Sequence, residues 1–129
     1  MKASISILLL TAALAGGQAY ATCSYPQPPD KIPDGATASE AQMISGMKAV
    51  RAYNAQIKAY TDCLKLEHDQ EVAKIDPTES PDKSKAEKAE LDSVLIKKND
   101  AAVDQATAVT NRFNEQVRIF KSKGQKGKS

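Results

Sequence analysis

The chain has 129 residues, of which 18 are Lys or Arg and 16 are Asp or Glu, and its net charge is +2. It contains no Trp and only 5% aromatic residues. A thick globular core is therefore excluded, and a chain of this kind needs a covalent staple or a partner for stability. The balanced charge also gives no basis for specific nucleic-acid binding, which uses a strongly basic surface.

Residues 1–21 have the pattern of a secretory signal peptide. Lys2 supplies a positive start, ISILLLTAALA supplies a short apolar run, and Ala19-Tyr20-Ala21 forms a cleavage site of the A-x-A type. The run is shorter than the roughly 20 residues of a membrane-spanning helix. We therefore expect export, cleavage after Ala21, and a periplasmic or secreted mature chain of one domain at most.

A lipid anchor on Cys23 is the alternative for this segment. Acylated cysteines usually follow a small residue and have a leucine three positions before them, whereas Thr22 and Tyr20 stand at these places. The sequence therefore favours a mature chain that begins at Thr22 without a lipid.

Residues 22–36 are rich in proline and end in the turn signal Pro33-Asp34-Gly35. The prolines are Pro26, Pro28, Pro29 and Pro33. Proline fixes the backbone torsion φ and cannot donate a hydrogen bond, so this stretch is predicted to be extended and polyproline-like. We call residues 22–36 the strap.

A first helix is predicted over 37–75. Two capping-box patterns compete for its start, with Thr37 or Ser39 as the cap. Pro77 ends the helix, because proline disfavours helical geometry at the preceding residue and lacks a backbone N–H. Apolar residues repeat along it in steps of four and three, which is a heptad pattern with polar interruptions. They are Met43, Met47, Val50, Ile57 and Leu64.

A second helix is predicted over 80–122. Ser80 is its expected cap and Pro81 its first helical residue. Its apolar residues follow a spacing nearer 3.6 than 3.5, which argues against a strict long coiled coil. They are Leu91, Leu95, Ala102, Ala106, Val109, Phe113, Val117 and Phe120. Gly124 is the expected stop, so residues 124–129 are predicted to form a disordered basic tail after a hairpin domain that spans 37–123.

A short link joins the two predicted helices, so they are expected to pack antiparallel. The predicted fold class is all-α, an antiparallel two-helix hairpin preceded by the strap. The expected neighbours are Leu64 with Leu91 and Leu95, Ile57 and Tyr60 with Ala101 and Ala102, and Met43 and Met47 with Phe113. Large side chains then face small ones and interdigitate. Two such hairpins could assemble further into a four-helix bundle.

The strap and the first helix have matching lengths. The helix rises about 39 Å from Thr37 to Cys63, and the chain from Cys23 to Thr37 spans about 43 Å in polyproline form. We therefore expect the strap to run back along the hairpin, to lay Tyr25 and Ile32 in its groove, and to be tied by a Cys23–Cys63 disulfide. Closing a loop of about 40 residues would stabilise the fold by about 4 kcal/mol. A bridge between two chains is the alternative pairing.

The single histidine, His68, stands close to Glu71. The two could share a metal ion, but no second histidine completes a bundle-type metal site. We expect a solvated helix end here, with no metal and no cofactor. Because no nucleophile with a base and an orienting group is recognisable, we also expect no enzymatic activity.

Two polar residues, Asn54 and Thr61, interrupt the apolar seam of the first helix. They either fix the register of an oligomer or face water at the edge of the seam. Gly46 costs about 1 kcal/mol relative to alanine inside a helix. It permits close approach either by the strap or by another subunit.

The end of the chain is basic, with no acidic residue after Glu115. Its lysines are Lys121, Lys123, Lys126 and Lys128. They would give a weak, salt-sensitive attraction to anionic lipid or polymer. A disordered, solubilising tail is the plainer interpretation.

The stretches CSYPQPPDKIPDGATASEAQM and VRAYNAQIKAYTDCLKLE resemble a group of uncharacterised exported proteins of Gram-negative bacteria. The shared features are a Cys-x-x-Pro opening at Cys23, an Ile-Pro-Asp-Gly turn from Ile32, two helical tyrosines at Tyr53 and Tyr60, and the second cysteine, Cys63. They cover about half of the chain. The resemblance implies a periplasmic helical protein and brings no known activity or cofactor.

The expected function is binding without catalysis. The chain would serve as a structural or interaction protein of the cell envelope, associating with an unidentified envelope protein or with itself. The alternative is a binder of anionic lipid or cell-wall polymer through the lysine-rich end.

Overall fold

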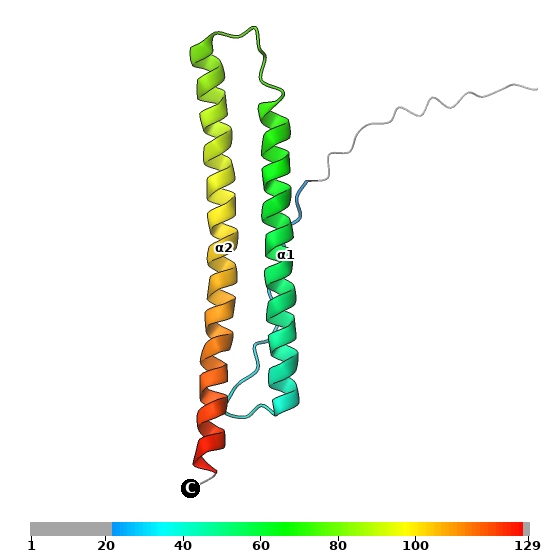
Figure 1. The fold of residues 1–129 in the computed structure, drawn as a ribbon, viewed down its shortest axis with the longest axis vertical. Helices are drawn as coiled ribbons and strands as arrows, with labels where there is room; N and C mark the ends of the chain where they lie inside the picture. Colours follow the sequence, from blue (N-terminus) through cyan, green and yellow to red (C-terminus); the bar gives the residue numbers. More distant parts are fainter. Residues whose placement is uncertain (1–21, 128–129) are drawn as a thin grey trace, which may run out of the picture.

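Two long antiparallel helices make up most of the described chain (Figure 1). The computed structural model describes residues 22–127, apart from the side chain of Lys126. Helix α1 spans Glu40–Val72 and helix α2 spans Pro81–Lys126. The predicted all-α hairpin is therefore confirmed. The expected signal peptide at 1–21 lies outside the described residues.

Helix α1 starts at the second of the two predicted capping boxes. The Ser39 hydroxyl accepts a hydrogen bond from the backbone N–H of Gln42 (3.2 Å), and Gln42 Oε1 accepts one from the backbone N–H of Ser39 (2.8 Å). The N–H groups of Thr37 and Ala38 both donate to the carbonyl of Asp34 in a separate turn. The predicted start at residue 37 is therefore too early, because that turn precedes the helix.

Helix α1 ends at Val72, three residues before the predicted end at Ile75. The N–H of Ile75 donates to the Val72 carbonyl three residues back (3.2 Å), so the backbone leaves α-helical geometry before Pro77 is reached. Helix α2 begins as predicted, with Pro81 as its first residue, although the Ser80 side chain makes no capping hydrogen bond.

The prediction that Gly124 ends the second helix is wrong. Helix α2 continues through it to Lys126, so part of the expected disordered tail at 124–129 is helical. Glycine ends a helix when it takes a left-handed conformation, and no glycine in the described chain has a positive φ. Lys123 ties this last part of the helix to the body, because its ammonium group donates to the Ala38 carbonyl (3.2 Å).

The core is a single strip of side chains between the two helices. Its buried apolar residues are Ala38, Met43, Val50, Tyr53, Ile57, Leu64, Ala102, Val109 and Phe113. Ala102 is completely buried and belongs to the same cluster as Ile57, which confirms the predicted register at its centre. Ala101, expected beside it, is exposed. The other predicted neighbours also meet, with Met43, Met47 and Phe113 in the main cluster and Leu64, Leu91 and Leu95 around one groove.

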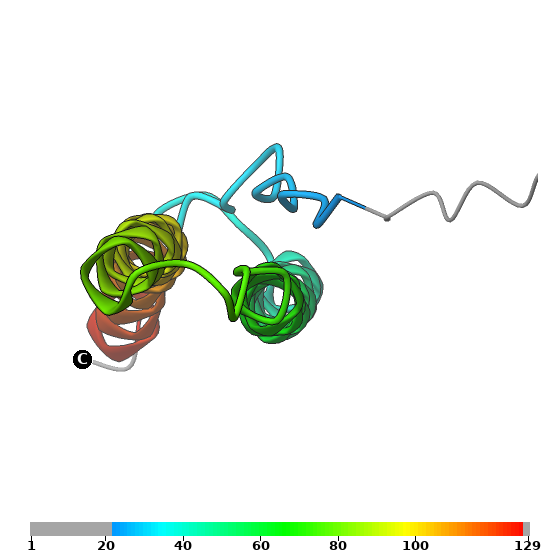
Figure 2. The ribbon, with the colours of Figure 1, turned by 90° about the horizontal axis from the view of Figure 1, so that it is seen from above.

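The strap lies along one side of the helix pair (Figure 2). Ile32 packs against the core cluster, and Pro33 lies against Gly46, where an added Cβ would come within 2.6 Å of Pro33 Cγ. Of the two alternatives for Gly46, the close approach of the strap is thus the one observed. The ring of Tyr25 meets the edge of the Tyr60 ring at a centroid distance of 5.0 Å, although Tyr25 remains 40% exposed.

The turn that ends the strap is fixed to α2. The N–H of Gly35 donates to Gln116 Oε1 (2.9 Å), and Asp34 Oδ1 accepts from the N–H of Ala36 (2.9 Å). A Cβ on Gly35 would lie 2.0 Å from the carbonyl oxygen of Gln116, closer than any side chain can approach. Glycine is therefore required here by the contact between two backbones.

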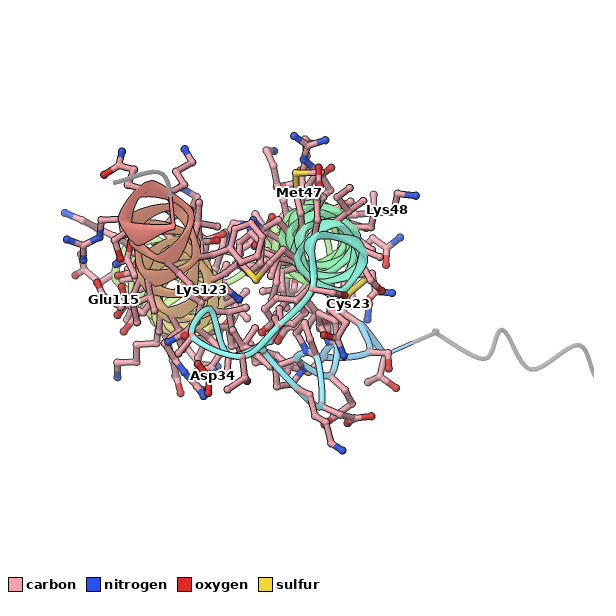
Figure 3. The ribbon with its side chains drawn as sticks, turned by 90° about the horizontal axis from the view of Figure 1, so that it is seen from below. Cys23, Asp34, Met47, Lys48, Glu115 and Lys123 are labelled. Carbon is pink, nitrogen blue, oxygen red and sulfur yellow. A yellow bond between two sulfur atoms is a disulfide. The ribbon has the colours of Figure 1, made fainter. Side chains whose placement is uncertain are left out.

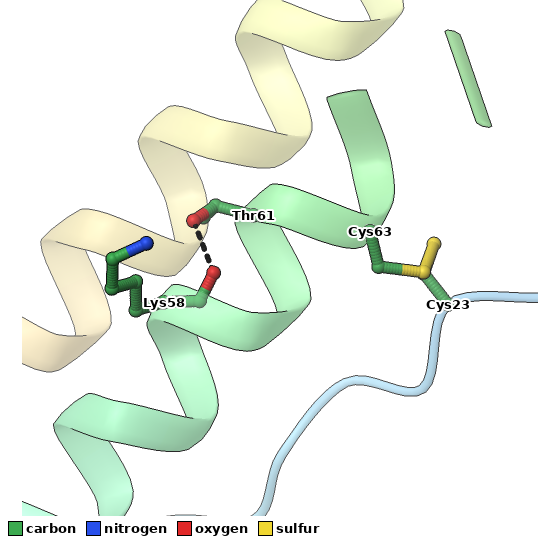
Figure 4. The surroundings of a disulfide bond; sticks show 4 residues. All are labelled: Cys23, Lys58, Thr61 and Cys63. Carbon is green, nitrogen blue, oxygen red and sulfur yellow. Dashed lines mark hydrogen bonds between the residues drawn. A yellow bond between two sulfur atoms is a disulfide. The ribbon is translucent and has the colours of Figure 1, made fainter. Parts of the chain in front are cut away.

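A disulfide joins Cys23 to Cys63 within one chain, with their Cα atoms 5.8 Å apart (Figure 4). It holds the far end of the strap and closes a separation of 40 residues. Helix α1 continues beyond Cys63 to Val72. About 14 Å of this helix, at about 1.5 Å per residue, therefore extends past the strap.

Candidate functional site

The part of the hairpin beyond the strap, residues 64–98, carries exposed apolar side chains. We call it the tip. Leu66 is 60% exposed, Val94 43% and Ile96 58%, and Val103 just outside the tip is 47% exposed. Single exposed apolar residues are ordinary, and Val94 and Ile96, two positions apart, point to nearly opposite sides of α2. Of these side chains, Val94 lines a groove between the helices, which makes the tip a candidate binding site.

An apolar groove runs between the two helices of the tip. It has a volume of about 90 Å³ and is lined by Leu64, Glu67, His68, Glu71, Leu91, Val94, Leu95 and Lys98. A second hollow of about 360 Å³ adjoins it toward the interhelical turn and shares Glu71, Leu91 and Val94 with it. The two hollows together are called the tip groove below.

The tip groove lies on the same side of the hairpin as the strap. Tyr60 and Cys63 contact the strap. Glu67, which lines the groove, follows Cys63 by about one turn of helix and Tyr60 by about two turns. The three residues therefore share one face of α1. Burial raises the pKa of the Tyr60 hydroxyl, and the nearby Tyr25 and Glu67 raise it further. Glu67 therefore lies on the same face of α1 as the end of the strap, about one turn beyond Cys63.

His68 is not the solvated helix end that we predicted. Only 14% of its side chain is exposed, its Nε2 lies 2.7 Å from Asp92 Oδ1 on α2, and its Nδ1 lies 3.3 Å from Asp69 Oδ1. The sequence contained a signal for this contact, because the register that sets Leu64 beside Leu95 also sets His68 beside Asp92. His68 thus links the two helices. In residues 22–127, no group of three or more His, Cys, Asp or Glu side chains is arranged to hold a metal ion.

The polar residues in the seam of α1 serve the hairpin itself. Asn54 Nδ2 donates to Thr110 Oγ1 across the helix pair (3.1 Å). Thr61 Oγ1 donates to the carbonyl of Lys58 in its own helix (2.9 Å; Figure 4). Asn54 therefore favours one register of α1 against α2, a role within the chain that the two predicted alternatives did not include.

The structure places two of the four lysines expected at an anionic surface. Lys123 lies over the Phe120 ring at 5.2 Å from its centroid and reaches the start of α1 through its bond to Ala38 (Figure 3). Lys121 is exposed, and residues two positions apart on a helix point to nearly opposite sides. These two lysines therefore share no face. The Lys126 side chain and Lys128 lie outside the described residues.

Tyr53 is the most deeply buried large side chain of the described residues, at 2% exposure. Its hydroxyl oxygen is buried and has no hydrogen-bond partner within that part of the chain. Burial raises the pKa of this hydroxyl, and the neighbouring Tyr25 phenol adds to the effect. The Tyr25 phenol of the strap is thus close enough to act on this hydroxyl, although the two make no hydrogen bond of ordinary geometry.

These features define a disulfide-strapped, all-α helical hairpin with an apolar groove at its tip. Neither helix, in the part of the chain that the structure describes, is long and apolar enough to cross a membrane. No family model, no curated protein and no solved structure matches the chain.

Proposed function

We propose that the protein acts by binding, as a non-catalytic structural or interaction protein of the cell envelope. The observation that supports this function is the apolar groove between the two helices of the tip, where the strap no longer covers the hairpin and Val94 is 43% exposed. Such surfaces lose unfavourable contact with water when a partner covers them. The partner is an envelope protein or a second copy of the chain.

Two features support an envelope location. The signal-peptide pattern at 1–21 directs export, with cleavage after Ala21. The Cys23–Cys63 disulfide forms and persists in oxidising compartments such as the periplasm.

The strap fits this function because it stabilises a hairpin that has only a thin core. It covers the groove up to Cys63 and leaves the tip uncovered. A rigid body with one free apolar end can present that end to a partner without reorganising, which lowers the free-energy cost of binding.

Photo-cross-linking in cells tests the proposal. A photoreactive amino acid is placed at Leu66, Val94, Ile96 or Val103 of the full chain, and at the exposed Lys48 near the opposite end as a control. We expect covalent products with an envelope protein, or with a second copy, from one or more of the first four sites and none from Lys48. Absence of products from all four sites contradicts the proposed function.

The alternative proposal is binding to anionic lipid or cell-wall polymer through the lysines at the end of α2. The exposure of Lys121 supports it, whereas Lys123 is engaged with Ala38 and Phe120. Replacing Lys121→Gln together with Lys128→Gln should then abolish co-sedimentation with phosphatidylglycerol vesicles. Unchanged co-sedimentation contradicts this alternative.

A further inference from the structure

The tip groove begins where the strap ends along α1. The strap ends at the Cys23–Cys63 bridge, and the first residue of the groove, Leu64, follows Cys63 directly. Glu67 lies one helical turn further along the same face. The surface of α1 that binds the end of the strap and the α1 wall of the tip groove are therefore adjacent, and no residue of the strap lines the groove.

The strap shows which kind of chain fits between these helices. It is extended, and it places Ile32 against the core, Pro33 against Gly46 and the Tyr25 ring against Tyr60. Proline and bulky apolar side chains make all three contacts. An occupant of the adjoining tip groove would meet the same pair of helices and the same kind of apolar floor.

The floor of the tip groove is apolar and partly open. Leu64 is buried at 3% exposure, Leu91 and Leu95 are half-buried, and Val94 is 43% exposed. From Leu64 to the end of α1 at Val72 the groove follows about 12 Å of helix at about 1.5 Å per residue, and Ile75 lies in the turn beyond it. A polyproline segment rises about 3.1 Å per residue, so about four residues fill the helical part and one or two more reach the turn.

The edges of the tip groove carry an excess of acidic groups. Four carboxylates and two ammonium groups line the two hollows, namely Glu67, Glu71, Glu87, Glu90, Lys74 and Lys98. Glu71 pairs with Lys74, whereas Glu67 and Glu90 form no ion pair within the described residues. A lysine or arginine on the occupant would therefore meet carboxylates that have no basic partner in this part of the chain.

We propose that the tip groove binds an extended, proline-containing segment of a partner protein, about six residues long, with apolar side chains toward the helices and a basic residue toward Glu67 or Glu90. The inference rests on the proposed function, because it names the partner class of the same binding surface. Polyproline segments suit such a groove, since they are extended before binding and lose little conformational freedom.

A peptide titration of the oxidised mature protein tests the proposal. The probe is a fluorescein-labelled peptide with the sequence of residues 24–33 and the change Asp30→Lys. The protein's own strap stays tied by the disulfide, so its groove is not available to the probe. We expect saturable binding by fluorescence anisotropy, and weaker binding of a matched peptide with Asp30→Glu and Lys31→Glu.

Two valines on α2 provide a matched pair of variants. Val94 and Val103 have similar exposure, but only Val94 lines the tip groove. We expect Val94→Asp to weaken binding of the basic peptide by about tenfold or more and Val103→Asp to leave it within about twofold. The double variant Glu67→Gln and Glu90→Gln should lose the preference for the basic peptide. Circular dichroism confirms that each variant remains helical.

Three results with the purified protein would overturn the proposal. They are no saturable binding of the basic peptide up to about 1 mM, equal losses in the two valine variants, and a dimer by light scattering that Val94→Asp alone dissociates. The last result assigns the tip groove to a second copy of the chain. Cross-links from Leu66, Ile96 or Val103 but none from Val94 would leave the proposed function standing and remove the groove as the site.

Discussion

Removing the disulfide should cost the protein a large part of its stability. The bridge closes a separation of 40 residues, and the chain-entropy model assigns about 4 kcal/mol to a loop of this length. A typical domain has a free energy of unfolding of about 5–15 kcal/mol. We therefore expect the double variant Cys23→Ser and Cys63→Ser to have a free energy of unfolding lower by about 4 kcal/mol and a melting temperature lower by roughly 20 °C.

Urea unfolding followed by far-ultraviolet circular dichroism measures this loss. The urea dependence of the unfolding free energy should become steeper in the variant, since its unfolded chain exposes more surface. Reduction of the wild-type protein should reproduce the loss, and reductant should not change the double variant. A loss below about 1 kcal/mol refutes the reasoning, because it means that the bridge constrains the unfolded chain very little.

Four further substitutions test individual positions. Gly35→Ala should lower stability by about 1–3 kcal/mol, because its Cβ would meet the α2 backbone at 2.0 Å. Gly124→Ala has nothing within 4 Å of its Cβ and should raise stability by up to about 1 kcal/mol. Equal melting temperatures of the two variants would contradict this. Tyr53→Phe removes a buried hydroxyl that makes no hydrogen bond of ordinary geometry but lies near the Tyr25 phenol, so stability at neutral pH should change by less than about 1 kcal/mol. Because the folded-state pKa of Tyr53 is raised, wild-type stability should fall as pH rises above about 10, and less steeply in the variant; identical slopes in urea titrations oppose this. The pKa of Asp69 is lowered, mainly by a hydrogen bond from Lys65. The ionised Asp69 carboxylate therefore stabilises the fold above about pH 4, and this stabilisation disappears as the pH falls through the pKa of the folded state. Asp69→Asn should be less stable at neutral pH with a gap that closes in acid, and a gap of constant size contradicts the assignment.

The main elements could be predicted because their signals are local. The Ser39 capping box, the first-turn Pro81 and the apolar repeats each act within a few residues of chain, and the structure places α1 and α2 accordingly. The disulfide followed from a comparison of two lengths, the strap and the helix beside it. Only the choice between pairing in one chain and pairing in two required the fold.

The misses have a common cause, since each depends on contacts between distant segments. The Asp34 turn holds residues 34–38 and Ser39 is extended, so the helix starts only after Ser39. This turn forms where the strap meets α2. Helix α2 passes Gly124 while Lys123 bonds to a residue at the other end of the hairpin.

The tip groove was missed because apolar periodicity predicts which side chains face the neighbouring helix, but not where a covering segment ends. The position of Cys63 within α1 was the available signal, since it limits how far the strap can reach. The residues of α1 beyond it, together with Leu91, Val94 and Leu95, have no further part of the strap to cover them.

The intact mass of the exported protein, trapped with a thiol alkylator and recorded with and without reductant, is the decisive measurement for a strap tied within one chain. We predict a mature chain that begins at Thr22, carries no alkyl group and is two hydrogens lighter than its reduced form. A doubled mass that collapses on reduction, two alkylated cysteines, or a lipid-modified chain that begins at Cys23 would contradict it.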